Sequence, residues 1–206
     1  IVGAGSAGTR HKRVLTGLDC DVKMLSQREG VGDFTSADEA FKWPFDLVVI
    51  ANETNQHIDT LLKISHFSSS TPVFIEKPLT HSFSEISQLN VKQNLWVGYN
   101  LRFHPLVIDI KKKMMQKKSV AYYAHFHVGQ DLATWRTNRH HEQSYSAHKS
   151  LGGGVVLDLS HEIDLALWLF GQWTNVQTIV SKASDKTIDS EDIALVIATA
   201  ESGSLI

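Results

Sequence analysis

The sequence contains few of the features that mark secreted, membrane-spanning or nucleic-acid-binding proteins. One cysteine, Cys20, excludes an internal disulfide framework and fits a reducing compartment, so we predict a cytoplasmic protein. No apolar run approaches the roughly 20 residues that a membrane-spanning helix needs. The net charge of −2 supplies no basic field for nucleic acid or anionic lipid, and the lysines at 111–113 fit the solvated side of a helix. We therefore expect a small-molecule partner, with no nucleic acid and no membrane.

The overall composition is that of one or two ordinary globular domains. Hydrophobic residues make up 42% of the chain and charged residues 20%, which is close to the globular average. The chain lacks an initiator Met and begins inside an apparent strand, and residues 201–206 look like a hairpin turn that enters another strand. We therefore expect it to be part of a longer protein with both ends missing.

The first half of the chain alternates between strands and helices. A continuous apolar run at 46–51 is typical of a parallel strand that is buried on both faces. Between the predicted strands, apolar residues recur at spacings of three and four, and Ser82 with Glu85 predicts a capping box at one helix start. The predicted strands are 1–2, 21–26, 46–51, 72–76 and 95–99. This alternation predicts an α/β fold with a doubly wound parallel sheet.

The second half has a different pattern. Residues 106–114 have helical spacing, and residues 120–128 alternate as a half-exposed antiparallel strand does. A polar stretch and three glycines at 152–154 precede a strongly apolar helix, predicted over about 158–170. Further strands are predicted at 176–183 and 193–200. We place a domain boundary near residue 100.

A glycine-rich turn, GAGSAG at residues 3–8, follows the first predicted strand. In this context Gly3 permits a tight turn, Gly5 lets a pyrophosphate approach the backbone, and Gly8 lets the helix pack closely. The following helix N-terminus presents N–H groups and a partial positive charge to phosphate. The alternative is an ordinary strand-to-helix turn. The strand and helix on either side favour dinucleotide binding.

The end of the second predicted strand bears on which dinucleotide binds. NAD-preferring proteins carry an acidic residue there for the ribose 2′-hydroxyl, whereas this chain has Ser26 and then Arg28. An arginine at this place neutralises a 2′-phosphate, so we favour NADP over NAD. The alternative is that Arg28 is a solvated loop residue and that Glu29 binds the ribose.

Several motifs occur in an ordered series along the chain: GAGSAG (3–8), IANETNQH (50–57), EKP (76–78), GYNLRFHP (98–105), YSAHKSLGGG (145–154) and DLSHEID (158–164). The series resembles the glucose–fructose oxidoreductase and inositol dehydrogenase family of Gfo/Idh/MocA-type NAD(P)-dependent oxidoreductases. The resemblance implies an NAD(P)-binding Rossmann domain over 1–100. It also implies a substrate and oligomerisation α+β domain over 101–206, built on a large, mostly antiparallel open sheet that is incomplete at the C-terminus here.

The resemblance also implies catalytic residues. The lysine of the EKP motif maps to Lys77, before a proline that is often cis, and the proton-handling pair maps to Asp158 and His161. Many family members have four positions from this Asp to this His, whereas here there are three, and either spacing keeps both on one helical face. His161 suits a general base because imidazole titrates near neutral pH. The alternative is a helix N-terminal histidine that hydrogen-bonds Asp158 or Asp164.

The wider site follows from the glycine turn, the strand ends and the resemblance. The expected cofactor-binding residues are Gly3, Gly5, Ser6, Ala7, Gly8, Ser26, Arg28, Ala51, Asn52, Thr54, His57, Glu76, Lys77 and Asn100. The expected substrate-binding residues are Lys77, Tyr99, Arg102, Trp135, Arg136, Tyr145, Asp158 and His161. The run 152–154 is either a slack loop or a place where backbone approaches a ligand.

These residues predict hydride transfer between a nicotinamide and a secondary alcohol or ketone of a sugar, sugar acid, cyclitol or nucleotide sugar. Two alternatives are a cofactor-binding sensor without turnover and a glycosidase that uses NAD transiently.

We predict no metal, because the histidine pairs at 125/127 and 140/141 lack cysteine partners and HEID is not H-E-x-x-H. An open sheet with one bare face predicts a homo-oligomer, a dimer or tetramer.

Overall fold

The computed structural model describes residues 1–87, 89–117, 121–135 and 140–206. The chain divides into two compact units, Ile1–Gly98 and Tyr99–Ile206, which are described separately below. No helix within the described ranges is both long and apolar enough to cross a membrane.

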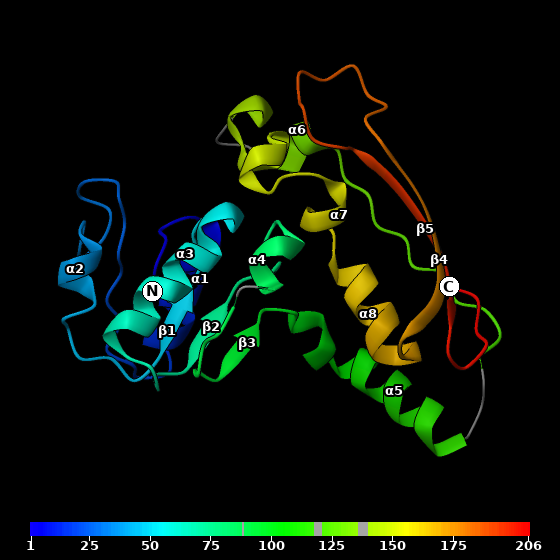
Figure 1. Ribbon diagram of the computed structural model, residues 1–206, viewed down its shortest axis with the longest axis horizontal. Helices are drawn as coiled ribbons and strands as arrows, with labels where there is room; N and C mark the ends of the chain where they lie inside the picture. The colour runs from blue at the N-terminus through cyan, green and yellow to red at the C-terminus, as the bar shows by residue number, and fades with distance from the viewer. Residues whose placement is uncertain (88, 118–120, 136–139) are drawn as a thin grey trace. The chain divides into compact units, whose positions relative to one another are not determined.

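The first unit is built on a parallel sheet (Figure 1). Its regular strands are β1 (Val48–Ile50), β2 (Val73–Ile75) and β3 (Leu95–Val97), hydrogen-bonded in that order. Single parallel bridges extend the sheet beyond β1, from Ile50 to Val2, from Val2 to Leu25 and from Leu25 to Phe34. Numbered along the chain, the six positions have the order 3-2-1-4-5-6, which is that of a dinucleotide-binding Rossmann fold.

Helices connect these strands. They are α1 (Ser6–Thr16), α2 (Ala37–Ala40), the 3₁₀ turn η1 (Thr54–Gln56), α3 (His57–Phe67) and α4 (Phe83–Ser87). The core of the unit forms where apolar strand residues meet the helices, with Ile50, Leu61, Ile64, Val73 and Ile75 fully buried. The predicted α/β fold with a parallel sheet is confirmed.

The predicted second strand, 21–26, is much shorter than expected. Leu25 alone of these residues forms a sheet bridge. The bridge from Leu25 to Phe34 is made by two bonds, from the N–H of Phe34 to the carbonyl of Met24 and from the N–H of Ser26 to the carbonyl of Phe34. The N–H of Met24 donates to the side chain of Asp33, so it is not available for pairing with a neighbouring strand.

The second unit combines short helices with an antiparallel pair of long strands. Strands β4 (Trp173–Ser181) and β5 (Ile193–Ala200) pair along almost their whole length. The preceding elements are η2 (Asn100–Phe103), α5 (Pro105–Lys117), α6 (Leu132–Trp135), η3 (His141–Gln143), η4 (Tyr145–Ala147), η5 (Lys149–Leu151), α7 (Val155–Asp158) and α8 (His161–Phe170).

The strand predicted at 120–128 is wrong for the described residues 121–128. Tyr123 forms one bridge to Leu205, and the backbones of Tyr122 and Ala124 bond to the same residue. Val120 lies outside the described residues. A strand needs a partner along its length, and here the pairing is confined to one position.

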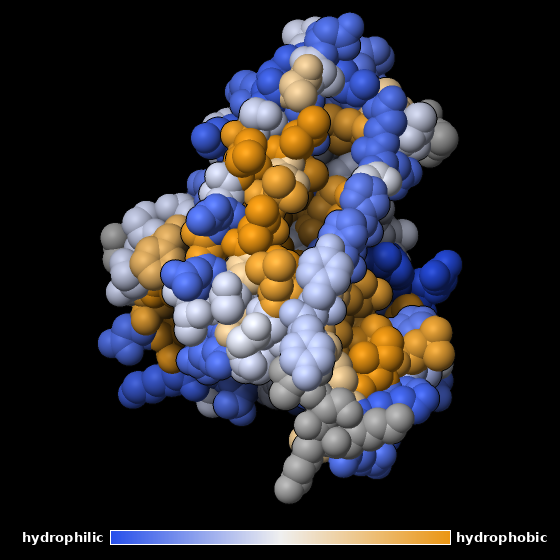
Figure 2. Space-filling model, turned by 90° about the vertical axis from the view of Figure 1, so that its right-hand side faces the viewer, coloured by the Kyte–Doolittle hydropathy of each residue, from blue (hydrophilic) through white to orange (hydrophobic). Residues whose placement is uncertain are grey.

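One face of the β4–β5 pair carries four exposed aliphatic side chains among polar ones. Directly paired residues of an antiparallel sheet share a face, so Leu195 lies beside Ile179, with Ile193 and Ile197 on the same side. All four side chains are exposed, and Figure 2 shows hydrophobic side chains gathered on the side of the molecule that carries these strands. Such a patch on a sheet face is typical of a surface that another chain or segment covers.

Candidate active site

The glycine turn has the geometry that a phosphate cradle requires. A Cβ on Gly3, whose φ is +104°, would lie 2.5 Å from the carbonyl oxygen of Ala51, and one on Gly8 would lie 1.9 Å from that of Gly3. A Cβ on Gly5 would meet no atom within 4 Å. Two glycines are therefore required by the fold itself, while Gly5 faces open space at the start of α1.

The N-terminus of α1 is prepared for an anion. Gly5 is the N-cap and brings no side-chain acceptor, and the first turn carries no acidic residue. Ser6 and Ala7 form that first turn, so their N–H groups are among those that a helix cannot satisfy internally. This turn fits the pyrophosphate of a dinucleotide.

Arg28 reaches the same turn from the end of the second strand. Its Nη2 donates to the carbonyl oxygen of Ala4 at 2.6 Å, and its side chain is exposed. Ser26, by contrast, is buried and its hydroxyl accepts from the N–H of Arg28 at 3.1 Å. Arg28 therefore keeps further guanidinium donors for a ligand, whereas the Ser26 hydroxyl serves the local turn.

The loop after β1 lies against the glycine turn. Ala51 and Asn52 form the wall that a Cβ on Gly3 would strike, and the Nδ2 of Asn52 donates to Thr60 at 2.9 Å. The Oδ1 of Asn52 is buried and has no hydrogen-bond partner among the described residues. A buried acceptor without a partner beside the cradle fits a ligand donor such as a ribose hydroxyl. Thr54 and His57, from the same expected set, are buried.

The loop after β2 carries Lys77. Its neighbour Glu76 accepts a hydrogen bond from His11 of α1, with 2.6 Å between Nε2 and Oε1. The bond between Lys77 and Pro78 is cis, as the resemblance implied, and the Pro78 carbonyl accepts from His57. Burial alone would raise the pKa of Glu76, but the hydrogen bond and charge of His11, with Arg10, outweigh it and leave that pKa below its ordinary value.

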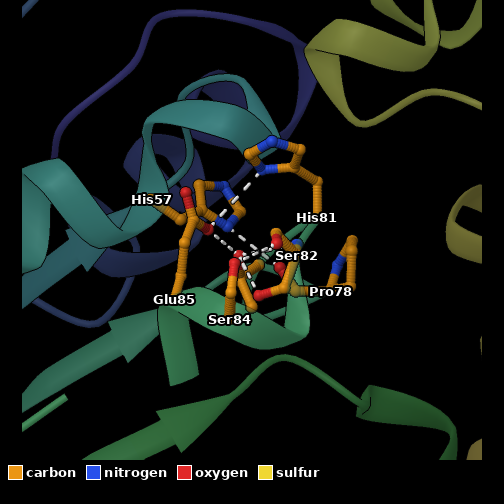
Figure 3. Close-up of polar contacts among 7 residues, drawn as sticks. His57, Pro78, His81, Ser82, Ser84 and Glu85 are labelled. Carbon is orange, nitrogen blue, oxygen red and sulfur yellow. Dashed lines mark hydrogen bonds and ion pairs between the residues drawn. The ribbon is translucent and has the colours of Figure 1, made fainter. Parts of the chain in front are cut away.

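The capping box predicted at the start of α4 is replaced by other contacts. The N–H of Ser82 donates to the hydroxyl of Thr80 at 3.1 Å, and that hydroxyl donates to the Glu85 carboxylate. Figure 3 shows Glu85 turned toward His81, and their closest polar atoms lie 3.6 Å apart. Through its contacts with Thr80 and His81, Glu85 stabilises the loop that follows Pro78.

In the second unit, η2 and the start of α8 assemble a polar cluster. Arg102 forms two hydrogen bonds to the buried Asp164 carboxylate, at 2.8 and 2.5 Å. The ring of Tyr99 packs edge-on against that of His161, with 5.7 Å between centroids, and its hydroxyl donates to Ser160 at 3.4 Å. Burial raises the pKa of Tyr99, so the phenol keeps its proton. These contacts fix one side of the His161 ring.

The helix predicted over about 158–170 begins later than expected, at His161, and ends at Phe170. Asp158 is the last residue of α7 and His161 is the first residue of α8, with a break at Leu159 and Ser160. The backbone leaves helical geometry at Leu159, where φ is −108° and ψ is 30°. Asp158 and His161 are therefore not held on one face of one helix, and the i, i+3 argument does not apply to them.

A cavity of about 240 Å³ lies within the second unit. Its lining includes Trp135, Asp158, Ser146 and Glu191. The glycine run beside it is no slack loop, because a Cβ on Gly153 would lie 2.3 Å from the carbonyl oxygen of Tyr145. These glycines allow the chain to pack against itself.

The expected site residues fall into two groups that the structure describes separately. The glycine turn, Ala51, Asn52 and the Lys77 loop belong to the first unit, and Tyr99, Asn100, Arg102, Asp158 and His161 belong to the second. Arg136 lies outside the described residues. Sequence reasoning gave His11 no role and considered Asp164 only as a partner of His161, whereas the structure pairs these residues with Glu76 and Arg102. No group of three metal-binding side chains occurs among the described residues.

Comparisons with known proteins agree with this geometry. A profile of the GFO/IDH/MocA C-terminal domain matches residues 121–206. The inositol 2-dehydrogenase of Rhizobium meliloti (strain 1021) is 21% identical, and the match covers 97% of this chain and 64% of that protein. The chain thus spans less than two thirds of this relative.

Solved structures share the fold over the whole chain. GenD2 from gentamicin A biosynthesis, in complex with NAD, has a TM-score of 0.81 at 22% identity, over 99% of this chain and 62% of that one. The WlbA dehydrogenase from Bordetella pertussis, in complex with NADH and UDP-GlcNAcA, has a TM-score of 0.81 at 16% identity, over 99% and 68%. The chain therefore shares the fold of these solved structures, and residues 121–206 are similar to the GFO/IDH/MocA C-terminal domain.

Proposed function

We propose that the protein is a nicotinamide-dinucleotide-dependent oxidoreductase that acts on a secondary alcohol or ketone of a sugar-like substrate. The observation that carries this proposal is the glycine turn, where Gly3 and Gly8 are closed by backbone and Gly5 alone opens onto the N-terminus of α1. The missing side chain and the unsatisfied N–H groups at this helix start suit a pyrophosphate. The relatives named above bind NAD or NADH or are named dehydrogenases.

Within this proposal, Arg28 selects the cofactor. It lies against Ala4 of the cradle with free guanidinium donors, and no acidic side chain occupies the end of the second strand. We therefore propose NADP(H) as the preferred cofactor. The NAD and NADH complexes of GenD2 and WlbA favour the other choice, with Glu29 at the ribose, so the comparison of the two cofactors is the first measurement.

The bound nicotinamide would supply the hydride chemistry, and the chain's own residues would bind the substrate and move a proton. Lys77 carries a cation at the carboxyl end of β2, which suits it to polarise the substrate oxygen. His161, steadied by Tyr99, would take the hydroxyl proton. Asp158, buried at the end of α7, would serve the substrate or His161 from a separate helical segment.

We also propose an assembly of copies of this protein. The exposed face with Ile179, Ile193, Leu195 and Ile197 is the surface that would pair, because an apolar sheet face is stabilised by burial. Light scattering of the protein beside an Ile179→Lys variant would test this. A monomer in both cases would refute the assembly.

The function is tested by titrating the full-length protein with NADPH and NADH, followed by turnover with a panel of sugars, sugar acids, cyclitols and nucleotide sugars. Lys77→Ala and His161→Ala should each lower kcat by at least about 10² while cofactor binding stays nearly intact. Binding without turnover of any panel member would favour the sensor. Release of a sugar without net cofactor reduction would favour the glycosidase, and no binding of either cofactor would refute the proposal.

A further inference from the structure

The tripeptide that carries Lys77 is held from both sides by histidines of two different helices. On one side His11 of α1 bonds to the side chain of Glu76, and on the other His57 of α3 bonds to the carbonyl of Pro78. Lys77 lies between these two anchored residues. Both histidines are far from it in sequence, so the arrangement exists only in the folded chain.

The His11 contact is directional. A carboxylate only accepts hydrogen bonds, so the Nε2 of His11 carries the proton that Glu76 receives at 2.6 Å. The ring also packs edge-on against Phe74 of β2, with 5.3 Å between centroids. Arg10 also lies near this carboxylate, with 3.8 Å between its Nη2 and Oε1 of Glu76. The hydrogen bond from His11 to Glu76 therefore depends on the proton at Nε2 of the imidazole ring.

The His57 contact uses the other ring nitrogen. Its Nδ1 lies 2.9 Å from the oxygen of Pro78, which Figure 3 shows beside it. Its Nε2 lies 3.2 Å from the backbone oxygen of Asn52. The side chain is fully buried, and burial lowers the pKa of His57 against the opposing effect of the surrounding carbonyls. A neutral ring donates one proton, and the shorter contact favours donation from Nδ1 to Pro78.

We propose that His11 and His57 are positioning residues that fix the backbone around Lys77, so that its ammonium group is presented in one place. The His57 side chain therefore acts through Pro78, in place of the direct cofactor contact expected from the sequence. The two helices begin at the glycine turn and at the loop after β1, which are the loops proposed to hold the dinucleotide. The expected effect of these histidines on turnover rests on the proposed function, whereas their expected effect on the position of Lys77 does not.

Because His11 and His57 use different ring nitrogens, each can be replaced by one amide that keeps its hydrogen bond and by another that loses it. The amide nitrogen of Asn stands near the place of a histidine Nδ1, and that of Gln near the place of Nε2. Gln at position 11 should keep the bond to Glu76, and Asn at position 57 should keep the bond to Pro78. The opposite replacements, His11→Asn and His57→Gln, should lose these bonds at similar side-chain volume.

The first readout does not need activity. Lysines of the full chain are ¹³C-dimethylated, the Lys77 signal is assigned with Lys77→Arg, and its chemical shift is followed in each variant. We expect His11→Asn and His57→Gln to move this signal, and His11→Gln, His57→Asn and the control His66→Gln on the exposed end of α3 to leave it in place. Thermal unfolding of each variant identifies any that has lost its fold.

The second readout is turnover. The two disrupting variants should lower kcat by about tenfold or more with little change in cofactor affinity, and the two preserving variants should stay within about threefold. The proposal is overturned if the Lys77 signal does not move in any variant. It is also overturned if the signal follows side-chain volume and does not separate His11→Asn and His57→Gln from His11→Gln and His57→Asn. A separation of these variants in a protein without turnover would support the positioning and refute the oxidoreductase.

Discussion

Arg102 donates two hydrogen bonds to the carboxylate of Asp164, and this pair joins the turn η2 to the first turn of α8. The carboxylate is buried, with 8% of its side chain exposed, whereas 40% of the arginine side chain is exposed. The carboxylate therefore depends on Arg102 for compensation of its lost hydration. The pair sets the position of the helix end from which His161 projects.

The first prediction concerns this pair. Arg102→Ala should lower the free energy of unfolding by about 1.5–3 kcal/mol, because it leaves a buried charge without its hydrogen-bonded partner. Urea denaturation measures this change. In the double variant with Asp164→Asn, part of the loss should be recovered. Strictly additive effects of the two substitutions would show that the pair contributes no interaction energy.

The second prediction concerns Glu76 and pH. Its pKa in the folded chain lies below the ordinary value of 4.5, so its ionised form stabilises the fold. The contribution is fully present above about pH 4.5 and is lost as the pH falls through the lower folded value. Glu76→Gln should therefore be less stable than the wild type at pH 7, by about 1–3 kcal/mol, and the difference should shrink in acid. A constant difference between pH 7 and pH 3 would contradict this.

The third prediction separates two glycines of the cradle. Gly8→Ala should destabilise the fold by about 3 kcal/mol or more, because its Cβ would overlap the carbonyl oxygen of Gly3. Gly5→Ala should cost less than about 1 kcal/mol, because its Cβ meets open space and its φ of −75° suits any residue. Gly5→Ala should nevertheless weaken dinucleotide binding by about tenfold or more, since its methyl group occupies the space of the pyrophosphate. Unchanged cofactor affinity in this variant would remove the cradle from the binding site.

The fourth prediction concerns the glycine run in the second unit. Gly153→Ala should lower the free energy of unfolding by about 2–3 kcal/mol, because the methyl group would strike the backbone at Tyr145 and Ser146. The matched control is Gly129→Ala, where a Cβ meets no atom within 4 Å. That variant should stay within about 0.5 kcal/mol of the wild type. Equal stability of the two variants by thermal or chemical unfolding would show that the run is slack.

Much of the first unit could be predicted from local patterns. Buried parallel strands show as short apolar runs, and β1, β2 and β3 lie within the predicted ranges. The glycine spacing predicted the turn, since a backbone with no room for a Cβ accepts only glycine. The cis bond after Lys77 was implied by the family resemblance.

The errors arose where the outcome depended on distant partners. The stretch 121–128 alternates as a strand does, but among the described residues its backbone forms a bridge only with Leu205. The apolar periodicity over 158–170 continues through a break at Leu159 and Ser160, because periodicity records which side chains are apolar and not where backbone hydrogen bonds are interrupted. The capping box, by contrast, failed for a local reason, because the Thr80 hydroxyl, five residues before Glu85, bonds both to the Glu85 carboxylate and to the N–H of Ser82.

The sequence by itself thus determined the alternation of strands and helices and the place of the glycine turn. These follow from interactions between residues that are close along the chain. Only the tertiary structure decided that His11 would meet Glu76 across 65 positions and that Arg102 would meet Asp164 across 62. Such pairs form when packing of the core brings distant segments together, and nothing in their local sequence distinguishes them beforehand.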